Sequence, residues 1–187
     1  MVRSRLAMLL ASACTGVVLT AAAGRAEDTA TKTKLPDPVA AAFKAAFPQG
    51  EIQKVDAEVE NGVTIYDFEF KDGDTEKETD IAADGTMLEY TVVIAADAVP
   101  AAAMTGIKKY AKGATIGRCE HIEGTYETKD GKNLKLAKPV TRYAAEMTKG
   151  KLKAEVIVNP DGSVAEAPEW VKAEPAPAPK TEAKTKE

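Results

Sequence analysis

The stretch from Gly62 to Tyr90 constrains the fold of this chain most strongly. From Tyr66 to Phe70, aromatic residues alternate with acidic ones, which is the period-two pattern of a strand with one buried and one solvent-facing side. Asp-Gly pairs follow at Asp72-Gly73 and Asp84-Gly85, where glycine readily adopts the positive φ of a tight turn. The stretch therefore predicts antiparallel strands joined by short turns, with one apolar face and one acidic face.

A helix is expected ahead of these strands. Apolar residues recur four positions apart from Val39 to Phe47, which places them on one side of a helix. We expect Asp37 to cap this helix and Pro48-Gln49-Gly50 to end it. Alternation from Val55 to Glu60 then predicts the first strand.

The same order of elements recurs after Val99-Pro100. Apolar residues at helical spacing are followed by alternating segments, and Asn159-Pro160-Asp161-Gly162 repeats the earlier Asp-Gly turn. The second unit is longer, and its excess lies in a lysine-rich insert near 124–139. We interpret the chain as an α+β protein with two tandem copies of one unit. Each copy is a helix plus a three- to four-stranded antiparallel meander, with the helices packed on one face of the sheet.

The two ends of the chain differ in composition from the part between them. Arg3 and Arg5 precede an apolar, alanine-rich run and small residues before Ala26, so 1–26 is predicted to be a signal peptide rather than a membrane anchor. Residues 27–34 are expected to form a flexible leader, and the proline, alanine, lysine and glutamate of 171–187 predict a disordered tail. The two copies then occupy 35–96 and 97–170.

The charge balance disfavours several kinds of partner. Removal of 1–26 takes away three of the 25 basic residues and none of the 29 acidic ones, which leaves a net charge of −7. Such a chain gains little from phosphates or anionic lipids, so we expect no nucleic-acid partner and no stable membrane insertion after cleavage. Cys119 is then the one remaining cysteine, so no intrachain disulfide is expected.

Cys119-Glu120-His121 is the segment whose residue types best suit chemistry. Alternation places Cys119 and His121 on the same side of a strand, and a structural zinc site needs a second pair of ligands that the sequence does not offer. We therefore expect Cys119 in the core, His121 in a strand, and Trp170 covering one end of the core. We predict no catalytic residue, no metal site and no cofactor, and an enzyme is the least favoured class.

Four short motifs of this chain resemble those of a known family. They are Leu35-Pro36, Phe47-Pro48, Gly62 with Tyr66 and Phe68, and Asp84-Gly85 with Leu88. The resemblance extends over about Leu35 to Glu166 and is to PepSY-like domains, more closely to the exported tandem PepSY-like proteins grouped with the β-lactamase-inhibitor-protein (BLIP) fold. It implies a periplasmic or secreted, non-enzymatic binding or inhibitory module, and it carries over no active-site residue.

The acidic face of the predicted sheet is the candidate recognition surface. Helices are expected to cover one face, so the opposite face offers the broad, rigid surface for an unidentified protein or peptide of basic character. Two alternatives remain open: the face serves only solubility, or the protein is a structural periplasmic protein that holds divalent cations weakly. The predicted partner-binding residues are Glu58, Asp67, Glu69, Glu76, Glu78, Asp80, Arg142 and Lys153.

Overall fold

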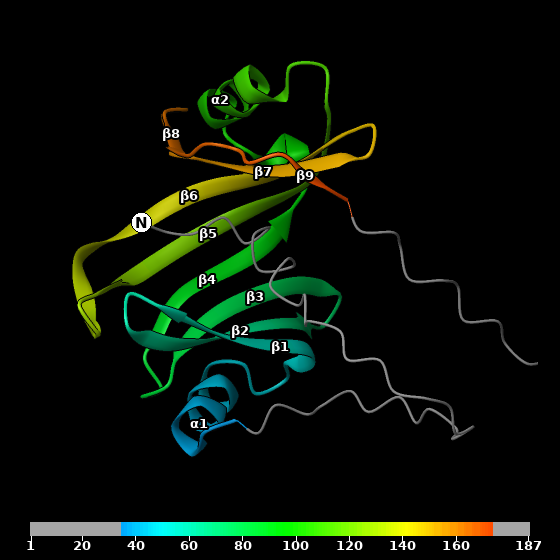
Figure 1. The fold of residues 1–187 in the computed structure, drawn as a ribbon. Helices are drawn as coiled ribbons and strands as arrows, with labels where there is room; N and C mark the ends of the chain where they lie inside the picture. Colours follow the sequence, from blue (N-terminus) through cyan, green and yellow to red (C-terminus); the bar gives the residue numbers. More distant parts are fainter. Residues whose placement is uncertain (1–34, 174–187) are drawn as a thin grey trace, which may run out of the picture.

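The computed structural model describes residues 35–173, and the predicted signal peptide and leader lie outside them. The first half consists of α1 (Asp37–Ala46), β1 (Glu51–Glu60), β2 (Val63–Asp72), β3 (Thr75–Ala82) and β4 (Met87–Ile94) (Figure 1). A short 3-10 helix, η2 (Ala96–Ala98), leads into the second half. That half consists of α2 (Ala101–Ala111), β5 (Thr115–Lys129), β6 (Lys132–Lys149), β7 (Leu152–Val158), β8 (Val164–Glu166) and β9 (Val171–Lys172).

All described strands belong to one antiparallel sheet. Its order is β1 to β8 as in the sequence, and β9 pairs with β7. Because each strand of that order pairs with the next one along the chain, short turns suffice for most connections. The predicted α+β class, with a large antiparallel sheet and two helices, is therefore correct. Neither helix of the described part is long and apolar enough to cross a membrane.

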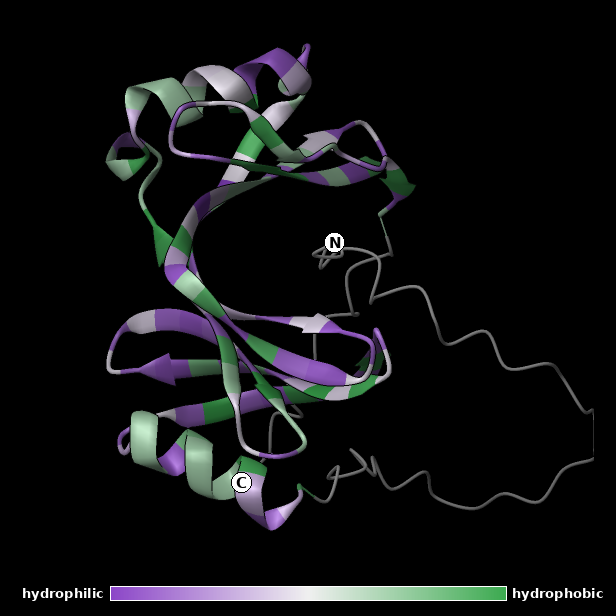
Figure 2. Cartoon of the chain, turned by 90° about the vertical axis from the view of Figure 1, so that its left-hand side faces the viewer, coloured by the Kyte–Doolittle hydropathy of each residue, from purple (hydrophilic) through white to green (hydrophobic). Residues whose placement is uncertain are grey.

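The sheet curves strongly between its two ends. Figure 2 shows α1 and α2 at opposite ends of the molecule, both on the outer side of this curve. The inner side, which we call the concave face, carries strand side chains that point away from the helices. The pairing between β4 and β5 makes this face continuous from one half of the chain to the other.

The core beneath α1 is aromatic. Val39 and Phe43 of the helix pack against Phe68, Phe70 and Ile81 of the sheet. The ring of Phe43 stacks on that of Phe68 with 4.7 Å between centroids and meets Phe70 edge-on at 5.0 Å. Burial of each such side chain contributes about 1.5–3 kcal/mol, so this cluster fixes the helix to the sheet.

The core beneath α2 uses smaller side chains. Ile107 of the helix packs with Cys119, Met147 and Val156 of the sheet, and Trp170 contacts the same cluster. Cys119 is 1 % exposed, which confirms its predicted place in the core. Trp170 is partly buried against this cluster, as expected for a side chain that covers one end of the core.

The two helices begin in the same way. Each starts after a proline, Pro36 or Pro100, that occupies the N-cap position without a side-chain cap. The expectation that Asp37 caps α1 is therefore wrong, because it is already the first helical residue. Glycines at positive φ then face both helix starts: a Cβ on Gly85 would lie 2.9 Å from the carbonyl oxygen of Pro38, and one on Gly162 would collide with that of Ala102.

One boundary differs from the sequence prediction. The tail predicted at 171–187 begins too early, because Val171 and Lys172 form β9 and pair with Lys153 and Leu152 of β7. The remaining tail residues from 174 onward lie outside the described residues. The insert near 124–139, for which the sequence predicted no particular structure, extends β5 and β6 into a long hairpin.

Candidate functional site

A row of carboxylates crosses the concave face. Strand register sets Asp56 opposite Asp67, Asp67 opposite Asp80, and Asp80 opposite Glu89, which we together call the acidic row. The row crosses β1, β2, β3 and β4 and spans roughly 14 Å, because neighbouring strands lie about 4.8 Å apart. Carboxylates directly opposite one another oppose strand pairing, so this arrangement lowers the stability of the sheet.

A lysine accompanies the row at its β1 end. The Nζ atom of Lys54 lies 2.5 Å from Oδ2 of Asp56 and 3.2 Å from Oε1 of Glu69. Each of these side chains is close to half exposed. Exposed pairs of this kind contribute at most about 1 kcal/mol, so the stabilisation from Lys54 at this end of the row is small.

An arginine joins the two halves across the middle of the concave face. Nε of Arg118 in β5 lies 2.7 Å from Oε1 of Glu120, and its guanidinium also pairs with Glu78 of β3. The register shift between Ile116 and Cys119 lies beside this arginine. Burial lowers the pKa of Arg118, but the charges of Glu120 and Glu78 outweigh it and hold that pKa above its usual value. Because β4 separates the two strands, this triad ties the first half to the second.

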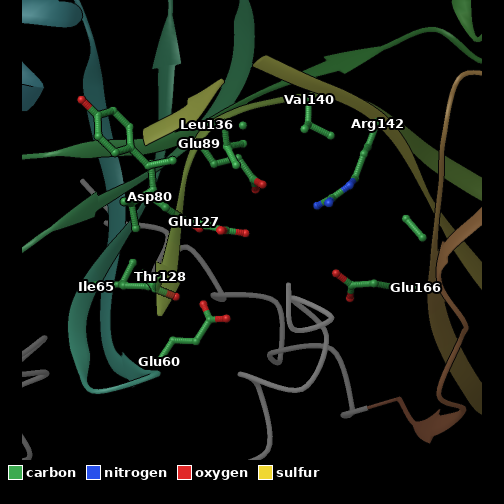
Figure 3. A pocket seen from close by; sticks show the side chains of 14 residues that line it. Glu60, Ile65, Asp80, Glu89, Glu127, Thr128, Leu136, Val140, Arg142 and Glu166 are labelled. Carbon is green, nitrogen blue, oxygen red and sulfur yellow. The ribbon is translucent and has the colours of Figure 1, made fainter. Parts of the chain in front are cut away.

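A cavity of about 300 Å³ opens where the acidic row reaches the long β5–β6 hairpin. Figure 3 shows Glu89 on one side of it, and Arg142 and Glu166 on the other. Carboxylates from five strands and one guanidinium share the cavity with an apolar wall. The acidic members are Glu60, Asp80, Glu89, Glu127 and Glu166, and the larger apolar ones are Ile65, Leu88, Tyr126, Leu136 and Val140.

The pKa of Glu166 in this cavity differs from that of an ordinary glutamate. Burial raises the pKa of Glu166 to about 7; Arg142 acts against this rise, and the charges of Glu89 and Glu60 add to it. Glu166 enters the cavity from β8, which pairs it with Ile157 of β7. At neutral pH this carboxyl is therefore about half protonated, which limits like-charge repulsion within the cavity.

The tip of the β5–β6 hairpin is fixed to turns of the first half. Nδ2 of Asn61 donates hydrogen bonds to the carbonyl and hydroxyl oxygens of Thr128, each at 3.0 Å, and Gly131 N donates to Asn61 O at 2.7 Å. Nδ2 of Asn133 donates to Oδ2 of Asp84 at 3.0 Å. These contacts, which we call the latch, hold the insert over the first half and thereby set one wall of the cavity.

Comparisons with known proteins identify the architecture. No family model matches the chain, and no curated protein matches it either. A BLIP-like protein from Bacteroides fragilis matches with a TM-score of 0.50 at 14% identity, over 81% of this chain and 96% of that one. The fold is BLIP-like. A candidate periplasmic protein from Bacteroides eggerthii matches with a TM-score of 0.51 at 15% identity, over 74% of this chain and 90% of that one. A DUF2874 family protein from Bacteroides uniformis matches with a TM-score of 0.51 at 14% identity, over 72% of this chain and 88% of that one.

The register of the BLIP-like sheet places every predicted recognition residue on the concave face. Asp80 and Arg142 line the cavity, whereas Glu78 pairs with Arg118 and Glu69 with Lys54. The remaining predicted residues are distributed over both halves of the face and lie outside the cavity. They are Glu58, Asp67, Glu76 and Lys153.

Sequence reasoning missed other members of this face. Asp56 and Glu60 have the same parity as Glu58 in β1, so strand alternation could have found them. Strand alternation in β4 could have placed Glu89 on this face in the same way. The position of Arg118 on this face depends on a register shift, and that of Glu166 depends on a three-residue strand. Neither feature has a clear signal in the sequence.

The Cys119-Glu120-His121 segment of the BLIP-like sheet does not form a reactive pair. Burial raises the pKa of the Cys119 thiol, which disfavours the nucleophilic thiolate. His121 lies on the same face as Cys119, with its ring 5.3 Å from that of Tyr143. Among residues 35–173, no three His, Cys, Asp or Glu side chains are grouped closely enough to hold a metal ion.

Proposed function

We propose that this chain is an exported, non-enzymatic binding or inhibitory module that recognises a basic protein or peptide through its concave face. The acidic row carries the proposal, because it sets four carboxylates opposite one another on adjacent strands. The predicted signal peptide and the likeness to a candidate periplasmic protein support export.

The cost of the acidic row is the physical reason to assign it a function. A sheet that needed only solubility could alternate lysine and glutamate on this face, and such a mixture would avoid the repulsion between facing carboxylates. The second half carries a mixed set on the same face, with Arg142 and Lys153 beside a single facing pair of carboxylates, Glu146 and Glu155. The concentrated negative charge of the first half would attract a basic surface and raise its rate of association.

We further infer that the two halves, 35–96 and 97–170, arose by duplication of one PepSY-like unit. Each half has a helix that starts after a proline and then four antiparallel strands in sequence. In each half a glycine at positive φ, Gly85 or Gly162, packs against the backbone two residues beyond that proline. The latch and the longer β5–β6 hairpin would then be additions of the second copy.

Weak binding of divalent cations is the competing function. A cation site needs several oxygen ligands around one point, typically six to eight for calcium. Within the part of the chain that the structure describes, no three acidic, histidine or cysteine side chains are grouped closely enough to hold a metal ion. No observation in that part favours cation binding over recognition of a basic partner.

A capture experiment with matched variants tests the proposal. Asp67→Asn/Asp80→Asn removes two charges from the acidic row, and Asp37→Asn/Asp97→Asn removes two exposed charges from α1 and η2. We expect the wild type and the α1/η2 variant to capture the same basic protein from periplasmic extract. The acidic-row variant should lose it while keeping its circular dichroism spectrum. Equal capture by all three would refute recognition through the concave face.

A further inference from the structure

We propose that the cavity beside the β5–β6 hairpin is a pocket for a primary ammonium group on an alkyl stem, the chemistry of a lysine side chain. This inference rests on the proposed function, because it names the side chain that the concave face selects from a basic partner. Ligand pockets of this size combine an apolar lining with a few polar groups that fix orientation, and this cavity does so.

The charges of the cavity favour a cation. Among the described residues that line it there are five carboxylates and one basic side chain, that of Arg142, so these side chains carry a net negative charge even when Glu166 is protonated. Its walls reduce contact with bulk water, and in that environment a cation is attracted more strongly than at an open surface. The latch holds Glu127 and Thr128 in place on the hairpin side, so the pocket is formed before a ligand arrives.

The apolar wall selects a cation that has a hydrocarbon stem. Tyr126 and Leu136 line the pocket from the hairpin, and Ile65 and Leu88 line it from the first half. Tyr126 also packs against the apolar cluster of Ile65 and Leu88. Lysine buries its methylene groups against such surfaces while its ammonium stays among polar groups, whereas a bare metal ion gains nothing from them.

The placement of the carboxylates favours an ammonium over a guanidinium. Glu60, Glu89, Glu127 and Glu166 come from β1, β4, β5 and β8, so they surround the cavity instead of forming one plane (Figure 3). An ammonium has three donors that rotate freely and suits such an arrangement, whereas the planar fork of arginine suits one carboxylate approached side-on.

The test uses the full-length protein and amide chemical shifts. We would titrate it with Nα-acetyl-lysine amide, with the same compound acetylated on its Nε atom, and with Nα-acetyl-arginine amide. The lysine derivative should shift the amide signals of Gly124, Tyr126 and Val140 in a saturable way, and the other two should bind at least about threefold more weakly. Equal binding of the Nε-acetylated compound, or tighter binding of the arginine derivative, would overturn the inference.

Matched variants separate the pocket from the rest of the face. Glu127→Gln/Glu166→Gln should weaken binding of the lysine derivative by about threefold to tenfold, whereas Glu123→Gln/Glu169→Gln, which removes two exposed charges elsewhere, should not. Equal affinity in both variants would refute the pocket even if a basic peptide still binds the concave face. If the lysine derivative binds as expected but no basic peptide does, the pocket stands and the proposed function fails.

Discussion

Replacement of Arg118 by methionine should destabilise the fold, because it removes the cation that joins β3 to β5. The side chains of Glu120 and Glu78 are 5% and 11% exposed, and that of Arg118 is 29% exposed. Loss of one partner costs about 3–5 kcal/mol for a fully buried pair and about 0–1 kcal/mol for an exposed one. Since this triad is mostly but not fully buried, we expect a loss of about 2–4 kcal/mol near neutral pH.

Urea denaturation of the wild type, Arg118→Met and Lys54→Met near neutral pH measures this loss. Lys54→Met is the matched control, because Lys54 also contacts two carboxylates but its pairs are close to half exposed. Its loss should stay below about 1 kcal/mol. If Arg118→Met costs no more than Lys54→Met, the triad does not hold the two halves together.

Three further predictions concern the core, the cavity and export. Phe43→Ala should lower the free energy of unfolding by about 3–5 kcal/mol, and a loss below about 1 kcal/mol would show that its aromatic contacts do not hold the helix. The pKa of Glu166, about 7 against an ordinary 4.5, means that its protonation stabilises the fold below about pH 4.5 and that this contribution is lost as pH rises through 7. Glu166→Gln should therefore gain stability relative to the wild type between about pH 5 and pH 8 in urea denaturation, and a constant difference would contradict the assignment. Mass spectrometry of the exported protein should find Glu27 at its N-terminus, whereas retained Met1 would refute the predicted cleavage.

The regular elements of the fold could be predicted because their signals are local. Alternation from Tyr66 to Phe70 and the four-residue spacing of Val39 and Phe43 each reflect which side of one element is buried. Turns at Gly73, Gly85 and Gly162 were expected because glycine adopts positive φ most easily, and all three do so. The start of β9 was missed, because a two-residue strand depends entirely on its partner β7.

The candidate site could be predicted only in part, because it depends on contacts between distant segments. Parity within a strand placed Asp67 and Asp80 on the same face, but only the pairing of β2 with β3 shows that they are opposite each other. The cavity needs the latch between Asn61 and Thr128, which are 67 residues apart. It also needs the short strand that brings Glu166 beside Arg142. None of these long-range contacts leaves a periodic signal in the sequence.

The central claim is that the concave face attracts a basic ligand through the acidic row. The most direct measurement is the fluorescence anisotropy of a labelled peptide of alternating lysine and serine, mixed with the wild type, Asp67→Asn/Asp80→Asn or Asp37→Asn/Asp97→Asn. At low salt the acidic-row variant should bind at least about threefold more weakly than the other two, and the difference should shrink near 0.15 M salt, where the Debye length is about 8 Å. Equal affinity of the two variants at low salt would show that only net charge matters and would contradict the claim.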